Sequence, residues 1–205
     1  MVRRTNKVQY ELDSKGIKQL PFNEIKAILR GADDLIMSGG RSMLAKILKG
    51  SKDKKLLELS LDKSPVYGFF DKLKLEEITA KIDWLIINDY LEIKYDYRLP
   101  LLAYTEKGWH IERDTYSDEL LERLKELLES GNYSFILDLK DRNRGMIFLL
   151  LDKIKATREK RFIPLLEAWA TIDYKKVQAV IREVIDALDN QRPFEVLPGG
   201  RDNIT

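Results

Sequence analysis

A cluster of positive charge stands out in the first third of the chain. Between Arg41 and Lys55 there are six basic residues and a single acidic one, Asp53. Side chains of this kind attract phosphate oxygens, and Gly50 and Ser51 add a backbone amide and a hydroxyl donor beside them. The cluster therefore indicates phosphate binding, although a charged loop between two helices is also typical of an ordinary solvated surface.

Other reactive groups are few. The sequence has no cysteine and one histidine, His110, which excludes disulfides, thiolate nucleophiles, cysteine-bound zinc and multi-histidine metal sites. It also has no GxxxxGK[ST] phosphate loop. We therefore expect no catalytic residue, no metal and no cofactor, and the chain is predicted not to be an enzyme.

A second polar group occurs in "DLKDRNRG", where Asp138, Asp141, Arg142 and Arg144 lie close together. Such a group either binds a phosphate or is simply a polar loop that opens a helix. The apolar run that follows is consistent with a helix start, and we favour the loop interpretation.

Composition fits a soluble globular protein, with 44% hydrophobic and 34% charged residues. No apolar run approaches the length of a membrane span or a signal-peptide core, and the predicted location is the cytoplasm, at the nucleoid if the source is bacterial. The net charge of +2 is unevenly spread. Residues 1–113 carry 21 basic and 17 acidic residues, or +4, whereas residues 114–205 carry 15 and 17, or −2.

Apolar periodicity predicts the elements that must position these groups. In the first half we expect helices over 24–38 with Asn23 as N-cap, over 41–49, and over 74–88 with Lys81 and Asp83 facing outward. Residues 54–70 are ambiguous, because Leu56, Leu57 and Leu59 suggest a short helix whereas Pro65 and Gly68 break the segment. Two strands, 91–95 and 101–105, flank a turn, and Thr105 is expected to cap a short segment ending near Ile111.

For the second half of the chain we expect only helices, over 117–131, 143–160, 161–173 and 174–190, with Asp173 as an N-cap. Helices of this length with short loops are typical of a small bundle or of a HEAT-like stack. The fold class is therefore mainly α with a small β-hairpin, a winged helix followed by a helical bundle. The predicted domains are a flexible arm (1–20), the winged helix (21–113), the helical domain (114–190) and a disordered tail (191–205).

Several short motifs, in order, resemble the RQC domain, the winged helix that follows the motor of RecQ-family DNA helicases. They are Gly50-Ser51, Lys54-Lys55, Asp62-Lys63-Ser64, Val66-Tyr67-Gly68 and Thr105-Glu106-Lys107-Gly108. The resemblance covers about residues 22–112. Leu61 replaces the histidine that usually precedes Asp-Lys, and no helicase motor or four-cysteine zinc module is visible, so we expect a free-standing RQC domain.

The resemblance implies DNA as the partner, recognised by structure more than by sequence. The hairpin tip, "KYDYRLP", could stack an aromatic ring on the end of a duplex, or its tyrosines could be ordinary strand aromatics. Mixed charges on the helix 74–88 disfavour sequence readout. The predicted DNA-binding residues are Arg41, Lys49, Ser51, Lys52, Lys54, Lys55, Lys63, Ser64, Lys81, Tyr97 and Arg98.

These observations favour a non-catalytic DNA-binding protein for duplex ends, forks or junctions, an adaptor in DNA repair, recombination or replication. The helical domain is expected to dock a protein partner or to extend the basic surface. Two alternatives stay open: the winged helix is a protein-interaction module, or it binds RNA.

Overall fold

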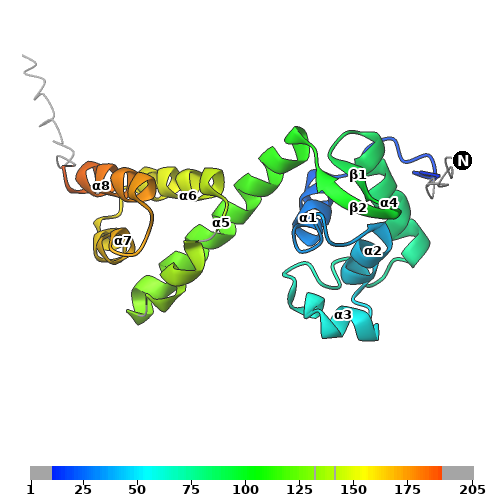
Figure 1. Cartoon of the computed structure of the whole chain (residues 1–205), viewed down its shortest axis with the longest axis horizontal. Coiled ribbons are helices and arrows are strands. Elements are labelled where there is room, and N and C mark those ends of the chain that lie inside the picture. The colour runs from blue at the N-terminus through cyan, green and yellow to red at the C-terminus, as the bar shows by residue number, and fades with distance from the viewer. Residues whose placement is uncertain (1–10, 132, 141, 191–205) are drawn as a thin grey trace, which may run out of the picture. The chain divides into compact units, whose positions relative to one another are not determined.

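The computed structural model describes residues 11–131, 133–140 and 142–190 (Figure 1). By its internal contacts the chain divides into two compact units, Met1–Tyr116 and Ser117–Thr205. The predictions for residues 1–10, within the arm, and for the tail 191–205 lie outside the described residues.

Helices form the core of the first unit. Their order is α1 (Phe22–Asp33), α2 (Arg41–Lys49), α3 (Lys54–Glu58), a 3-10 turn η1 (Leu61–Lys63) and α4 (Leu75–Ile87). The apolar stripes of α1, α2 and α4 meet in one cluster, in which Ile28, Leu44, Ile47, Ile78 and Ile82 are fully buried. Each such side chain contributes about 1.5–3 kcal/mol by leaving water.

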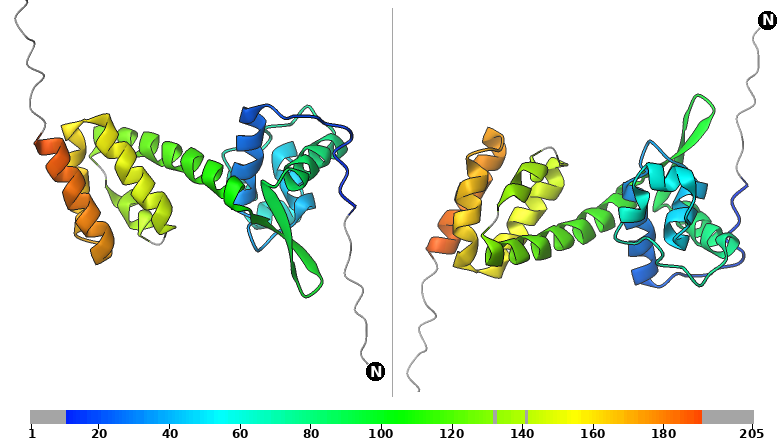
Figure 2. Two further views of the ribbon diagram at one scale, coloured as in Figure 1. Left: turned by 90° about the horizontal axis from the view of Figure 1, so that it is seen from above. Right: turned by 90° about the horizontal axis from the view of Figure 1, so that it is seen from below.

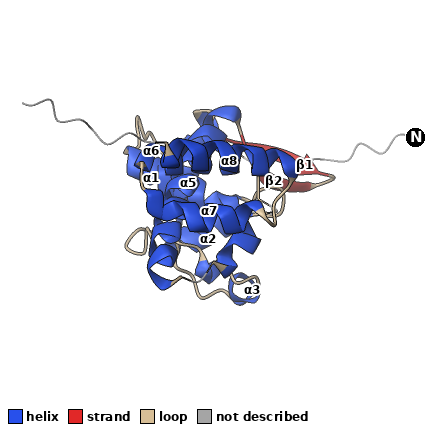
Figure 3. Ribbon diagram, turned by 90° about the vertical axis from the view of Figure 1, so that its left-hand side faces the viewer, coloured by secondary structure: helices blue, strands red, loops and turns tan. Residues whose placement is uncertain are grey.

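A two-stranded hairpin completes the winged helix and confirms the predicted fold class. Strands β1 (Leu91–Asp96) and β2 (Leu99–Tyr104) pair antiparallel, with Leu91 opposite Tyr104 and Asp96 opposite Leu99. Near its base the hairpin buries Leu91 and Leu102 in the core, whereas the two views of Figure 2 show its tip extending away from the helices of this unit. In the described part of the chain these are the only strands, drawn red in Figure 3.

The N-terminal end of α1 differs from the prediction. The helix begins at Phe22, one residue before Asn23, and Pro21 occupies the N-cap position without a side-chain cap. Residues 11–20, expected within a loose arm, lie on the first unit instead. Leu20 is buried in the core and Ile17 packs against it, because these apolar side chains have a core surface to cover.

The helix after the hairpin is much longer than the short segment expected there. As predicted, Thr105 caps it, since its hydroxyl accepts a hydrogen bond from the Gly108 amide at 3.1 Å. The helix α5 (Glu106–Ser130) then runs without interruption through the residues at which we expected a new helix to begin. No glycine or proline occurs between Trp109 and Ser130, so nothing in the sequence breaks it.

Three of the helices predicted for the second half occur as expected: α6 (Arg144–Thr157), α7 (Ile163–Ala170) and α8 (Lys175–Asp189), with 3-10 turns η2 (Ser134–Leu139) and η3 (Lys160–Phe162) before α6 and α7. Helix α8 packs on both α6 and α7. Tyr174, not Asp173, occupies the N-cap position of α8. The Asp173 carboxylate instead accepts hydrogen bonds from the buried Trp169 indole at 2.7 Å and from the Tyr174 amide at 2.6 Å.

Candidate nucleic-acid interface

The lysine cluster lies where α2 ends and α3 begins. Gly50 ends α2 in a left-handed conformation, with φ of 74°, and the Ser51 amide donates to the Lys46 carbonyl at 3.0 Å. This tight turn matches the glycine C-cap, which places an exposed loop directly after the helix. Lys52, Lys54 and Lys55 follow, all with exposed side chains.

The exposed lysines differ in whether they already form an ion pair. Lys54 is 91% exposed and lies 3.6 Å from Glu58 one turn along α3, an ion pair of little strength at such exposure. Within the described part of the chain, Lys52 and Lys55 make no ion pair. Their ammonium groups are therefore available to a phosphate.

Lys46 neutralises the one acidic residue of the cluster. Its ammonium lies 2.7 Å from the Asp53 carboxylate, and this hydrogen bond holds the pKa of Asp53 below its ordinary value. The other carboxylate oxygen of Asp53 caps α3 by accepting from the Lys55 amide at 3.0 Å. Asp53 is thus a structural anion whose charge is already compensated.

The segment from Asp62 to Gly68 is tied against the end of α2. The Gly68 amide donates to the Ile47 carbonyl at 3.0 Å, and the Tyr67 hydroxyl donates to the Ser51 carbonyl at 2.9 Å. A side chain on Gly50 would come within 3.0 Å of the Gly68 Cα, so the two glycines permit this close approach. The contact brings Lys63, which is exposed, to the same part of the fold as the lysine cluster.

Three predicted site residues in this region are buried or already bonded within the fold. The Ser64 side chain is buried, and its hydroxyl has no hydrogen-bond partner among the described residues. The Lys49 ammonium donates to the backbone carbonyl of Asp71. The hydroxyl of Ser51 accepts from the Asp53 amide at 3.3 Å, so it also supports the loop. DNA contact by these three residues stays a prediction.

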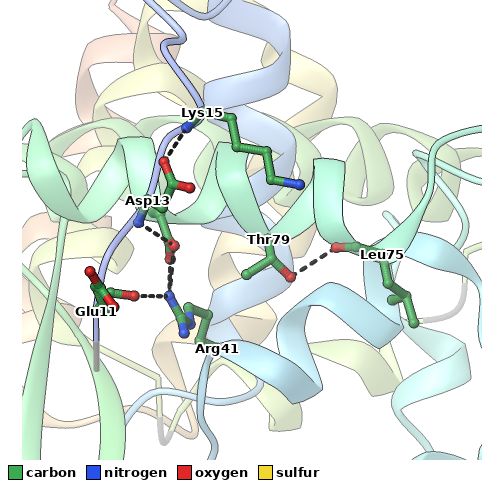
Figure 4. A network of polar contacts seen from close by, with 7 residues as sticks. Glu11, Asp13, Lys15, Arg41, Leu75 and Thr79 are labelled. Carbon is green, nitrogen blue, oxygen red and sulfur yellow. Dashed lines mark hydrogen bonds and ion pairs between the residues drawn. The ribbon is translucent and has the colours of Figure 1, made fainter. Parts of the chain in front are cut away.

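Arg41 belongs to a network that ties the N-terminal segment to α4 (Figure 4). Its guanidinium lies 2.5 and 2.6 Å from the two carboxylate oxygens of Asp83, which is buried. The Asp13 amide donates to the same carboxylate at 3.0 Å, and Lys15 pairs with Glu76 at 3.3 Å. No sequence pattern indicated that residues 11–15 lie on α4, and the prediction that Asp83 faces outward is wrong.

Lys81 is held in a similar way. Its ammonium lies 2.5 Å from the Glu24 carboxylate, and both side chains are at most about one-fifth exposed. The charges of Arg41 and Lys81 are therefore neutralised within the fold. That either contacts DNA stays a prediction, and our proposal does not depend on them.

The hairpin tip is the most exposed aromatic site of the described chain. Tyr97 is 93% exposed and adopts a left-handed conformation with φ of 51°, and Arg98 and Leu99 beside it are exposed as well. An aromatic ring in water at a tight turn has no packing role. An ordinary packed strand aromatic is therefore disfavoured for this tyrosine, and its stacking on a duplex end stays a prediction.

The base of the hairpin is rigidly attached. The Tyr104 hydroxyl donates to the Leu29 carbonyl at 2.8 Å, and the Leu102 backbone exchanges hydrogen bonds with Met37 and Gly39 at 2.8 and 2.9 Å. Burial raises the pKa of Tyr104 well above its ordinary value, so this donor keeps its proton. The hairpin therefore carries its exposed tip on a base that is hydrogen-bonded to the helical core.

Comparison with known proteins decides the family. A family model described as the RQC domain matches residues 22–125, about half of the 205-residue chain. The chain belongs to the RQC domain family. It is also similar to the ATP-dependent DNA helicase RecQ of Bacillus subtilis (strain 168), at 31% identity over 101 residues, which cover 42% of this chain and 17% of that helicase. No solved structure matches.

The RQC domain is a non-catalytic, DNA-binding winged helix of RecQ helicases, so this membership implies DNA binding. Within the described residues, no cluster of histidine, cysteine, aspartate or glutamate is arranged to hold a metal ion. No helix in the described ranges combines the length and apolar character needed to cross a membrane.

Three of the motifs that carry the RQC resemblance have a packing explanation here. Gly50 and Gly68 permit the close approach described above, and Gly108 leaves room for a backbone carbonyl. A side chain on Gly108 would lie 1.9 Å from the Tyr90 carbonyl oxygen. These glycines permit the packing of the RQC domain, whereas its exposed lysines and wing tip are the groups available to contact a ligand.

Proposed function

We propose that this chain is a non-catalytic DNA-binding protein that engages duplex ends, forks or junctions, and that it serves as an adaptor in DNA repair, recombination or replication. The observation that carries the proposal is the wing tip. Tyr97 is almost fully exposed on a hairpin whose base is anchored in the core. Such a ring stacks on the last base pair of a duplex, and stacking is indifferent to sequence.

Phosphate contacts supply the rest of the affinity. Lys52, Lys54, Lys55 and Lys63 are exposed and lie on segments that are hydrogen-bonded to the end of α2. Contacts of lysine with phosphate position a duplex without reading its sequence. Arg98, next to Tyr97, adds a cation at the tip itself.

The contacts that already engage α4 support recognition of DNA structure over DNA sequence. In a helix-turn-helix protein the equivalent helix enters the major groove. Here Asp13 and Lys15 bond to residues of α4, and Lys81 is paired with Glu24. Groups that are already engaged cannot read base edges, so the wing and the lysines are left to bind DNA.

The test is binding of the full chain to a forked duplex, a blunt duplex and a single strand, with the wild type, Tyr97→Ala and Tyr97→Phe. Loss of a stacked ring costs about 1–3 kcal/mol per base, so Tyr97→Ala should weaken fork binding about 5- to 150-fold. Tyr97→Phe should retain it. Leu99→Ala, a truncation of another exposed side chain at the tip, is the matched control and should have little effect.

Equal fork binding by the wild type and Tyr97→Ala would remove the stacking role. Weak binding of every DNA even at low salt would refute the proposal and favour a protein-interaction module. Competition between matched RNA and DNA forks addresses the third possibility, because preference for the RNA fork would make the chain an RNA-binding factor.

A further inference from the structure

The second unit contains a basic pocket that the proposed function does not use. Its volume is about 240 Å³, smaller than the roughly 300–1,000 Å³ of pockets for drug-sized ligands. It lies between the segment that opens α6 and the beginning of α8. Its walls are formed by Lys140, Arg142, Arg144, Ile147, Asp173, Tyr174 and Val177.

The charges of the pocket are unbalanced. Of the described residues that line the pocket, three are cations and one, Asp173, is a carboxylate whose two oxygens already accept from the Trp169 indole and the Tyr174 amide. Among the described residues, Lys140 and Arg144 form no ion pair with a carboxylate. These two cations therefore border a space that is large enough for a compact anion.

The positive field comes from side chains. The first amides of α6, those of Gly145 and Met146, donate to the Asn143 side chain at 2.9 and 3.4 Å, so the helix start is already capped. The apolar walls, Ile147 and Val177, are buried.

Tyr174 adds a flat apolar surface at the rim. Its side chain is about half exposed, and the Lys140 ammonium and the Arg144 guanidinium lie 5.3 and 6.0 Å from the centre of its ring. A phosphate held by these cations would thus lie close to an aromatic ring. Cations that bind phosphate, beside a ring on which a base stacks, are the two parts of a nucleotide site.

We propose that this pocket binds the phosphate of a nucleotide whose base stacks on Tyr174. The nucleotide is either free or part of a nucleic-acid strand, since both offer the same phosphate and base. The site lies wholly within the second unit and does not depend on DNA binding by the winged helix. It reverses our preference for a purely structural role of the arginines in "DLKDRNRG".

The experiment follows backbone amide shifts of the full chain by NMR during titration with inorganic phosphate, thymidine 5′-monophosphate and a short oligothymidine. Saturable shifts at Gly145 and Tyr174 are expected with all three. Lys140→Gln/Arg144→Gln removes two charge-assisted contacts and should weaken each probe about tenfold or more. Both side chains are exposed, so the fold should be preserved, which unchanged shifts elsewhere would verify.

Matched variants separate this site from general electrostatics. Lys155→Gln/Arg182→Gln removes one lysine and one arginine, both exposed and on helices of the same unit, and should change affinity less than twofold. Tyr174→Ala should weaken thymidine 5′-monophosphate about fivefold or more and leave inorganic phosphate unaffected, whereas Tyr174→Phe should restore nucleotide binding.

The two sources of the nucleotide give different results. Binding of oligothymidine at least tenfold tighter than of the monophosphate identifies a strand, and comparable binding identifies a free nucleotide. The absence of localised shifts with every probe would overturn the site, as would an equal loss in the control variant. Failure of the winged-helix proposal is seen separately, because that proposal is tested by fork binding, whereas this site is tested by the shifts of Gly145 and Tyr174.

Discussion

Substitution of the exposed lysines of the cluster is the sharpest test of the phosphate contacts. In Lys52→Ala/Lys54→Ala/Lys55→Ala, three charges are removed from side chains that are exposed and carry no packing. The capping hydrogen bond of α3 uses the amide of Lys55, which alanine retains. The variant should therefore fold like the wild type while losing its affinity for a forked duplex.

The magnitude follows from counterion release. Each lysine that contacts a duplex phosphate contributes about 0.9 to the slope of log affinity against log salt. Three contacts thus predict a decrease of about 2.7 in the magnitude of the slope. If the weak ion pair of Lys54 with Glu58 keeps that lysine from DNA, two contacts remain and the decrease is about 1.8.

The assay is fork binding by fluorescence anisotropy at several salt concentrations between about 50 and 200 mM, the range over which such slopes are large. Across this fourfold range, the ratio of wild-type to variant affinity should fall about 12-fold for two contacts and about 40-fold for three. Lys18→Ala/Lys155→Ala/Arg182→Ala is the control, because it removes the same charge from exposed cations that form no ion pair in the described part of the chain. Parallel slopes for the wild type and the cluster variant, or an equal change in the control, would refute the assignment.

Three further predictions concern the fold. Asp83→Ala leaves the Arg41 guanidinium partly buried without its carboxylate, so it should lower the free energy of unfolding by about 3 kcal/mol in urea denaturation, and a loss below about 1 kcal/mol would show that the pair behaves like a surface pair. Gly108→Ala forces a methyl group against a backbone carbonyl and should cost more than about 3 kcal/mol in the same measurement; a near-neutral result would contradict the close packing. Lys46→Ala should raise the pKa of Asp53 toward its ordinary value in an NMR titration, because the hydrogen bond that stabilises the charged carboxylate is lost. Because the folded-state pKa of Asp53 is lowered, its contribution to stability is present above the unfolded pKa and is lost as pH falls through the folded pKa, and an unchanged pKa in the variant would contradict this coupling.

The parts of the fold that were predictable are those fixed by local patterns. Apolar spacing indicated α2 and α4 closely, and alternation between Leu91 and Tyr95 indicated the first strand. Thr105 was predicted as a cap, and its hydroxyl accepts a hydrogen bond from an amide only three residues away. Each of these signals is carried by residues within one or two turns of each other, so tertiary packing had little to override.

The errors arose where the chain contradicts its local preference. The residues between Arg113 and Ser117 are poor helix formers, which suggested a boundary, yet α5 passes through them and buries Ser117 completely. Weak propensities of a few tenths of a kcal/mol per residue are outweighed by packing and by the cooperativity of a helix that is already formed on both sides.

Charge is the least predictable property of the site, because its neutralisation depends on contacts far along the chain. Arg41 pairs with Asp83 and Lys81 pairs with Glu24, over separations of 42 and 57 residues. Counting residues 41–55 gives six cations, but Arg41 and Lys46 are paired with carboxylates and Lys49 is held by a backbone carbonyl.

Three of the six cations are therefore already engaged within the fold. The other three are Lys52, Lys54 and Lys55, the lysines of the triple variant described above. Cations that are neutralised in the free protein release fewer counterions when DNA binds, because they must first leave their carboxylates. The salt slope therefore reports exposed lysines and not the count of basic residues. Lys46 is paired with a carboxylate and Lys52 is not, although only six positions separate them in one basic cluster. Substitution of Lys46 should accordingly change the salt slope far less than substitution of Lys52.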